Sequence, residues 1–202
     1  SLSLPPRNLH FLPFTFMHAL LIRLRLATIT TSRKDKYITD ATIAANGAAA
    51  DAGRWVNTLW PVAALRPVRA AEGNLRAHTY AKTSPFSDTG ERILPSSKFF
   101  DFMEKFRELE SERKAKTQEF IDSYDHWVLE AQAMRGTLFN ADDYPSASEA
   151  ARSFRSSLES KALPAVSHLP DELRDVEEIK ASIQSQIDEG IATAKRDISM
   201  RI

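Results

Sequence analysis

The sequence predicts a single α+β domain that is predominantly helical, with a small N-terminal β element followed by a bundle of long helices. An alternating, strand-like run near the N-terminus predicts the β element. Several later segments carry apolar residues at steps of three or four, which is the spacing of one helix face. The last of these segments has a narrow apolar stripe, so part of the bundle is expected to be coiled-coil-like.

The β element is predicted from residue 20 onward. Ile22, Leu24 and Leu26 alternate with Arg23 and Arg25, which is typical of a half-buried strand with one basic face. We favour an ordinary edge strand, because arginines on an edge deter pairing with other sheets. A basic platform for phosphate groups is the alternative.

The first helix is predicted over residues 35–60, where a stripe made mostly of alanine recurs at helical spacing up to Pro61. Trp55 lies on this stripe and Trp60 lies just beyond it, so we expect both in the core. A shorter helix is expected to start at Pro67, a favourable first-turn residue. The Pro- and Ser-rich residues 82–97 predict a loop.

One long helix is predicted from a cap at Ser96 or Ser97 to a stop at Gly136. Its first apolar stripe covers residues 99–109 and its second covers 120–134. The residues between these stripes are almost wholly polar. Two helices broken near residues 114–117 are the alternative, although no glycine or proline stands there.

The next helix is predicted from the capping box at Ser146 and Glu149 to about residue 163. The last helix begins near Pro170, and its isoleucine-rich stripe is expected to pack antiparallel on the long helix. Self-association through this stripe, which would make a homo-oligomer, is the alternative. The stripe residues that would carry it are Leu173, Val176, Ile183, Ile187, Ile191 and Ile198.

The formal net charge of zero hides two opposite halves. The chain has 27 Lys+Arg and 27 Asp+Glu. Residues 1–98 hold 13 of the bases and 6 of the acids, a balance of +7, and residues 99–202 have the opposite balance of −7. This asymmetry indicates solvated acidic helices, a nucleic-acid or other acidic partner, or docking between neighbouring copies.

We divide the chain into a leader, a basic part and an acidic part. Residues 1–16 are expected to be a non-native or flexible leader, since Met17 is a plausible start. Residues 17–97 form the basic α+β part, and residues 98–202 form the acidic helical part of the same domain. The apolar run near the N-terminus is too short for a membrane span, so we expect no membrane contact.

A nucleic-acid partner would be held by the basic half. Single strands are bound by cations beside aromatic side chains, and Tyr37, Tyr80 and Phe86 are the aromatic candidates. The candidate basic residues are Arg23, Arg25, Arg33, Lys34, Lys36, Arg54, Arg66, Arg69, Arg76 and Lys82.

Catalytic motifs are missing from the sequence, and the absence of cysteine excludes disulfides, thiol nucleophiles and cysteine metal sites. We therefore expect no catalytic residue, cofactor or metal. A metal-dependent enzyme is a minor alternative, because Glu119, Asp122, His126 and Glu130 share one helix face. A calcium loop at residues 140–143 lacks the required spacing.

Four runs between residues 23 and 146 carry a resemblance to a known group of proteins. They are the strand start IRLRLAT, the run DAGRWVNTLWP, the loop TSPFSDTGERILPSS and the late LFNADDYPS. Together they resemble an uncharacterised family of bacteriophage and prophage proteins. This resemblance implies a small soluble phage-type protein, in the cytoplasm of a bacterial host, and transfers no catalytic residue.

The sequence leads to two functional hypotheses. The first is a non-enzymatic, self-assembling binding protein whose basic half contacts nucleic acid, single strands being favoured, and whose helical half makes protein contacts. The second is a structural or virion-type homo-oligomer without nucleic-acid binding, or an inhibitor of a host protein.

Overall fold

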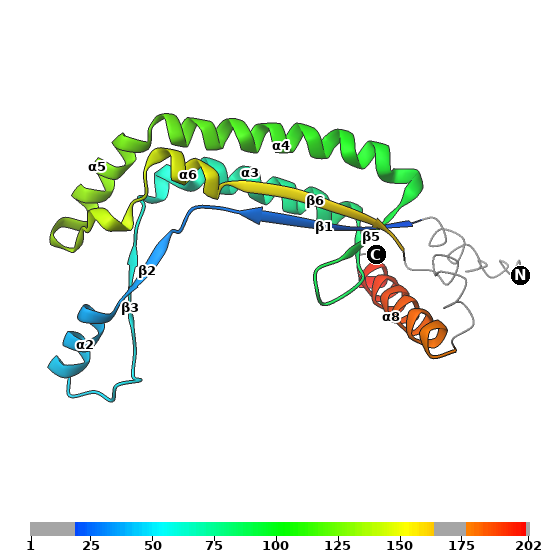
Figure 1. Ribbon diagram of the computed structural model, residues 1–202, viewed down its shortest axis with the longest axis horizontal. Coiled ribbons are helices and arrows are strands. Elements are labelled where there is room, and N and C mark those ends of the chain that lie inside the picture. The colour runs from blue at the N-terminus through cyan, green and yellow to red at the C-terminus, as the bar shows by residue number, and fades with distance from the viewer. Residues whose placement is uncertain (1–18, 164–176, 201–202) are drawn as a thin grey trace, which may run out of the picture. The chain divides into compact units, whose positions relative to one another are not determined.

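The computed structural model describes residues 19–163 and 177–200 of the chain (Figure 1). It is α+β and predominantly helical with a small antiparallel sheet, so the predicted fold class is confirmed. The chain divides into two compact units. Unit 1 comprises residues 1–25, 74–109 and 157–202, and unit 2 comprises residues 26–73 and 110–156. Each unit therefore combines residues of the basic half with residues of the acidic half.

Unit 1 contains a four-stranded sheet. Its strands are β1 (Ala19–Ala27), β4 (Ser84–Pro85), β5 (Arg92–Pro95) and β6 (Arg155–Ala162). They lie in the order β4-β5-β1-β6, and β1 runs antiparallel to β5 with Leu21 opposite Ile93. The predicted N-terminal strand is therefore confirmed. The expectation that it is an edge strand is wrong, because β1 has a neighbouring strand on each side.

Two helices pack together in unit 1 through aromatic and aliphatic side chains. They are parts of α3 (Val62–Lys82) and α4 (Phe99–Asp122). The His78 imidazole of α3 stacks on the Phe102 ring of α4, with ring centroids 4.9 Å apart. Leu75, Phe102 and Phe106 are buried, as their helical spacing predicts.

The C-terminal helix α8 (Glu177–Met200) packs on β4 and on the cluster beside it. Ala194 is fully buried in a cluster with Leu21 and Ile93, and Ile191 packs against that cluster. The expected antiparallel pairing with the long helix is therefore wrong. The small residues of α8 bring its backbone close to the sheet instead. Two of the predicted stripe residues, Leu173 and Val176, lie outside the described residues.

Unit 2 has a core centred on Trp60, whose side chain is buried. Three aromatic rings surround its indole, with centroids at 5.3 Å for Phe120, 5.4 Å for Tyr124 and 5.0 Å for Tyr144. The prediction of Trp60 in the core is confirmed. The other elements of this unit are β2 (Ser32–Asp35), α2 (Lys36–Ala45), β3 (Trp55–Thr58), α5 (Tyr124–Arg135), η2 (Gly136–Leu138), η3 (Ala141–Asp143) and α6 (Ala147–Ser153).

The predicted helix over residues 35–60 is wrong beyond Ala45. Helix α2 ends there, and the chain turns at Gly47, which has a positive φ of 59°. Residues 55–58 then form β3, which pairs antiparallel with β2. Glycine readily adopts this conformation. Long-range strand pairing then overrides the high helix propensity of the alanine-rich stretch, because propensity is only a weak determinant in a folded protein.

The long helix predicted up to Gly136 is interrupted at Ser123, which separates α4 from α5. Gly136 directly follows the end of α5 and has a positive φ, so the predicted stop at this glycine is confirmed. At the other end, the predicted serine cap is wrong. The chain enters α4 through the 3-10 turn η1 (Ser96–Lys98), whose N-cap is Pro95.

Two further segments are strands where the sequence predicts a helix or a loop. The capping box of Ser146 and Glu149 is confirmed, but α6 ends at Ser153 and β6 follows it. The segment predicted as a loop over residues 82–97 contains β4 and β5. Strands β5 and β6 each pair with β1, which is distant in sequence, whereas β4 pairs with the nearby β5.

The fold also mixes the two charged halves. Unit 2 contains 12 Lys+Arg and 13 Asp+Glu, which leaves 15 and 14 for unit 1, so each unit is nearly neutral. Ion pairs join bases of the basic half to acids of the acidic half, including Arg25 with Glu159 at 2.9 Å and Arg33 with Asp143. Part of the opposite charge is therefore balanced inside the protein.

Candidate functional site

The candidate site is an arm of unit 2, which we define as residues 32–58. It consists of β2, α2, a connecting loop over residues 46–54, and β3. In the antiparallel pair, Ser32 lies opposite Thr58 and Asp35 lies opposite Trp55. Figure 1 shows the arm extending from the helices of unit 2, with α2 at its far end.

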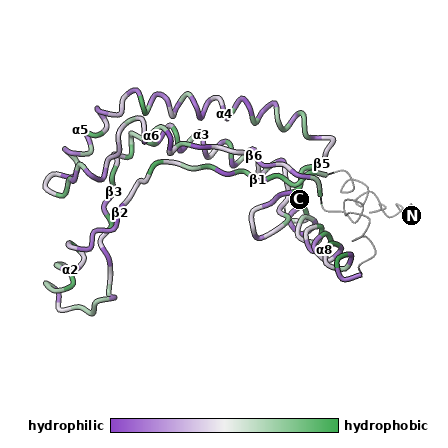
Figure 2. The backbone as a smooth tube through the Cα atoms, viewed as in Figure 1, coloured by the Kyte–Doolittle hydropathy of each residue, from purple (hydrophilic) through white to green (hydrophobic). Residues whose placement is uncertain are grey.

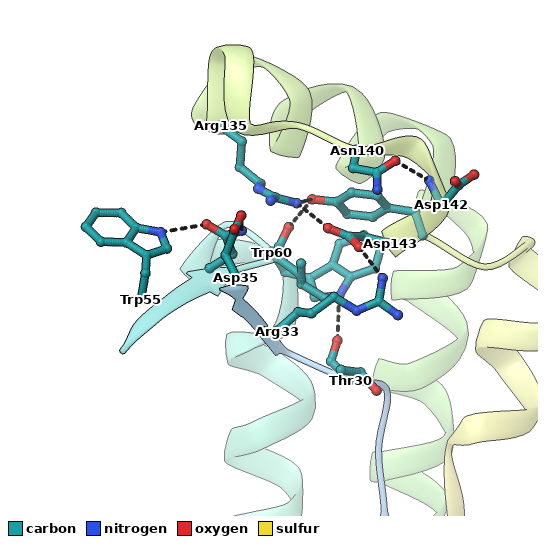
Figure 3. A network of polar contacts seen from close by, with 12 residues as sticks. Thr30, Arg33, Asp35, Trp55, Trp60, Arg135, Asn140, Asp142 and Asp143 are labelled. Atoms are coloured by element: carbon teal, nitrogen blue, oxygen red, sulfur yellow. Dashed lines mark hydrogen bonds and ion pairs between the residues drawn. The ribbon is translucent and has the colours of Figure 1, made fainter. Parts of the chain in front are cut away.

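The base of the arm is held by Asp143 of η3. Arg33 of β2 and Arg135 of α5 both form ion pairs with this carboxylate, the second at 2.9 Å (Figure 3). The Asp143 side chain is 4% exposed, and burial opposes its ionisation. Hydrogen bonds and charges from Arg135 and Arg33 outweigh this effect and hold the pKa of Asp143 below its ordinary value.

Two aromatic side chains fix the backbone beside the arm. The Tyr144 hydroxyl donates to the Leu59 carbonyl at 2.7 Å, just after β3. The Trp60 indole N–H donates to the Thr30 carbonyl at 3.1 Å, just before β2 (Figure 3). Both strands of the arm are therefore attached to the aromatic core of unit 2.

Inside the arm, one chain of hydrogen bonds joins the strands to α2. The Asp35 side chain caps α2 by accepting from the Ile38 amide at 3.0 Å, and it also accepts from the Asn57 amide group at 3.0 Å. The side-chain oxygen (Oδ1) of Asn57 in turn accepts from the Trp55 indole N–H at 2.9 Å. This network fixes the orientation of the Trp55 ring.

The arm exposes aromatic and basic side chains together. Tyr37 is 84% exposed and Trp55 is 44% exposed. Lys34 and Arg54 are exposed and form no ion pair with any residue in 19–163 or 177–200. Helix α2 has no buried residue, although Figure 2 shows neutral to hydrophobic colours along much of it.

A pocket of about 210 Å³ lies between α2 and the loop over residues 46–54. Its walls combine apolar groups with a few polar ones. The residues that matter most for its chemistry are Thr39, Thr42, Ile43, Asn46, Arg54 and Trp55.

The ten predicted basic candidates do not share one unit. Six belong to unit 2, with Arg66 and Arg69 on α3 and the other four in the arm. Arg23, Arg25, Arg76 and Lys82 belong to unit 1. Within the arm, Arg33 is engaged by Asp143, and Lys36 pairs with Asp40.

The aromatic candidates differ in their surroundings. Tyr37 is exposed on the arm, as a stacking residue must be. Tyr80 has the Arg92 guanidinium over its ring at 4.6 Å, and Phe86 packs against α8. Trp55 is exposed, so its predicted core position is wrong. The residues beside Trp55 are consistent with a strand rather than a helix, because Gly53 interrupts the helical pattern and Val56 is a residue that favours strands.

The residues of the minor metal hypothesis make other contacts. Glu119 pairs with Lys116 at 2.8 Å, and Asp122 accepts from the Gln118 side chain at 2.7 Å. In the part of the chain that the structure describes, no three His, Asp or Glu side chains are placed to hold a metal ion. Asp143 of the calcium hypothesis is occupied by two guanidinium groups.

Comparison with known proteins adds no relative. No protein-family model, no curated protein and no solved structure matches the chain. Among the helices of residues 19–163 and 177–200, none has the length and apolar character needed to cross a bilayer.

Proposed function

We propose that this chain is a non-enzymatic, self-assembling binding protein of phage type, which binds single-stranded nucleic acid through its arm and contacts proteins through its helices. The arm supports this proposal because it exposes two aromatic side chains, Tyr37 and Trp55, and two basic side chains, Lys34 and Arg54. Aromatic faces next to free cations are the combination that holds single strands without sequence preference. A cytoplasmic location in a bacterial host belongs to the same proposal.

The acids of the arm do not oppose this role strongly. The Asp35 carboxylate is occupied as the cap of α2, and Asp40 pairs with Lys36. Asp51 is exposed in the loop, three residues before Arg54. Lys34 and Arg54 form no ion pair within the described residues, so a phosphate backbone that approaches them would meet two available cations.

The test is the salt dependence of binding to labelled oligo-dT, followed by fluorescence anisotropy. Each phosphate contact with a single strand adds about 0.7 to the slope of log K against log salt. The double variant Lys34→Ala/Arg54→Ala is expected to bind more weakly, with a slope reduced by up to about 1.4.

The matched control is Lys105→Ala/Arg107→Ala, which removes one exposed lysine and one exposed arginine from α4. It is expected to bind oligo-dT as the wild type does. Absence of oligo-dT binding at low salt, or equal losses in both double variants, would reject the arm as the binding surface.

The self-assembly part is tested by light scattering across protein concentration. Ile183 and Ile187 of α8 are only half-buried in one copy of the chain, which leaves apolar surface for a second copy. Ile183→Asp/Ile187→Asp is expected to lower the measured mass. A wild-type monomer at all concentrations would reject self-assembly.

A structural homo-oligomer without nucleic-acid binding, or an inhibitor of a host protein, is the second candidate. Large apolar side chains outside the arm favour it, because Phe100, Leu129, Met134 and Leu138 are all exposed. A defined oligomer with no affinity for DNA or RNA would select the structural role. A monomer without nucleic-acid affinity would leave the inhibitor role.

A further inference from the structure

The pocket of the arm is the right size for one flat ring rather than for a large ligand. Its volume is about 210 Å³, whereas pockets for drug-sized ligands have volumes of about 300–1,000 Å³. Trp55 lines it, and Ile43 and Ala48 contribute apolar wall. The pocket lies on the arm that carries the exposed Tyr37 and Lys34, and Arg54 is itself one of its lining residues.

Its polar groups can be separated into occupied and available ones. The Thr39 hydroxyl is occupied, since it donates to the Asp35 carbonyl at 2.6 Å and accepts from the Trp55 amide at 2.8 Å. The Asn46 side-chain N–H donates to the Thr42 carbonyl at 2.8 Å, which leaves the Asn46 side-chain oxygen as an acceptor.

The charged donor in the pocket is the Arg54 guanidinium. Within the described residues it makes no hydrogen bond or ion pair. An acceptor oxygen from Asn46 and donor groups from Arg54 match a flat ring whose edge carries both an N–H and an acceptor atom. Every nucleobase has such an edge, because thymine, uracil and guanine have a ring N–H beside a carbonyl oxygen, and adenine and cytosine have an amine N–H beside a ring nitrogen.

We propose that this pocket binds a single base of the nucleic-acid strand, against Trp55 and between Asn46 and Arg54. The inference rests on the proposed function, because it needs a strand bound to the arm. It adds a base site to the contacts with the phosphate backbone.

The first experiment compares the wild type on oligo-dT and on an abasic strand of equal length. Stacking of one base corresponds to a gain of about 5- to 150-fold in affinity, so oligo-dT is expected to bind tighter by a factor in this range. Equal affinity for oligo-dT and the abasic strand would overturn the base site. Because both strands would still bind, the proposed function would not be rejected.

The second experiment fills the pocket with Ala48→Leu, with Ala49→Leu as the matched control. Both alanines are exposed in the same loop, and Ala48 lines the pocket whereas Ala49 is not part of its wall. Ala48→Leu is expected to lower oligo-dT affinity to that of the abasic strand and to keep the salt slope. Ala49→Leu is expected to keep the preference for oligo-dT.

The outcomes separate the two proposals. Equal oligo-dT affinity in Ala48→Leu and Ala49→Leu would overturn the base site alone. If the wild type binds neither oligo-dT nor the abasic strand, the proposed function is rejected, and the base site with it. If Ala48→Leu does not fold by circular dichroism, the wild-type comparison of oligo-dT with the abasic strand decides the question.

Discussion

Arg113 of α4 and Glu72 of α3 form an ion pair inside unit 2, where their side chains are only 2% and 5% exposed. The Arg113 Nη2 and Nε atoms lie 2.9 and 3.2 Å from the same Glu72 oxygen. Nη2 also donates to the Ala27 carbonyl at 2.8 Å. One guanidinium therefore connects α4 with α3 and with the end of β1.

Removing this arginine is expected to destabilise the protein strongly. Arg113→Met takes the cation away from the buried Glu72 carboxylate, and breaking a buried pair in this way costs about 3–5 kcal/mol. Glu72→Met/Arg113→Leu is expected to be more stable than Arg113→Met, because it buries no charge at this position. Urea unfolding measures the free energy of unfolding of both variants. A decrease below about 1 kcal/mol in Arg113→Met would show that the ion pair contributes no more than a solvated one.

Asp143→Asn is expected to lower stability at neutral pH, because Arg135 is buried beside it. The pKa of Asp143 in the folded protein is below its ordinary value. Its contribution is therefore present above the unfolded pKa of about 3.9 and is lost as the pH falls through the lower folded pKa. Unfolding midpoints measured between pH 7 and pH 2 should fall less steeply in Asp143→Asn.

Arg33→Ala is the control for this prediction. The Arg33 side chain is 57% exposed, so its pair with Asp143 is solvated and should contribute at most about 1 kcal/mol. The acid dependence should largely survive in Arg33→Ala, since Arg135 still faces the carboxylate. An equal loss of stability at neutral pH and an equally weakened pH dependence in Arg33→Ala and Asp143→Asn would contradict a dominant role for Arg135.

Features with local causes could be predicted from the sequence. The capping box needs only Ser146 and Glu149, which are three residues apart. The buried stripe containing Phe102 and Phe106 follows from helical spacing alone. The alternation around Ile22 likewise identified β1.

Features with distant causes could not be predicted. Strand β3 exists because it pairs with β2 across more than twenty residues, and β6 joins a sheet whose other strands lie far earlier in the chain. Arg113 stands in the almost wholly polar run between the two apolar stripes, and only its position opposite Glu72 explains its burial. Lys34 and Arg54 of the candidate site were among the predicted basic residues. The pocket depends on the unpredicted turn at Gly47.

Gly190→Ala is expected to disrupt the packing of α8. A Cβ at this position would lie 2.0 Å from the Phe86 ring, so the ring or the helix must move. Gly73→Ala in α3 is the matched control, since a Cβ there has no atom within 4 Å. Gly73→Ala should raise the free energy of unfolding by about 0.5–1 kcal/mol, because alanine has a higher helix propensity than glycine.

Thermal unfolding of both glycine variants checks this prediction. The midpoint should fall for Gly190→Ala and rise for Gly73→Ala. A rise in both would mean that Phe86 swings aside without loss of contact, and that the close approach of α8 to the ring contributes little.

Asp35→Ala is expected to loosen the arm while leaving the rest of unit 2 folded. The carboxylate caps α2 at the Ile38 amide and also binds Asn57, so its loss removes a cap worth about 1 kcal/mol. A helix as short as α2 is marginal by itself. Amide hydrogen exchange should therefore accelerate across residues 36–45 and remain unchanged in the buried part of α3.

The matched variant is Asp40→Ala, which removes a carboxylate from the same helix. Asp40 pairs with Lys36 four residues earlier at an exposed position, and such pairs contribute about 0.3–0.5 kcal/mol. Exchange in α2 should therefore change much less than in Asp35→Ala. Equal acceleration of amide exchange in the two variants would show that net charge, rather than the hydrogen bonds of Asp35, holds α2 against β2 and β3.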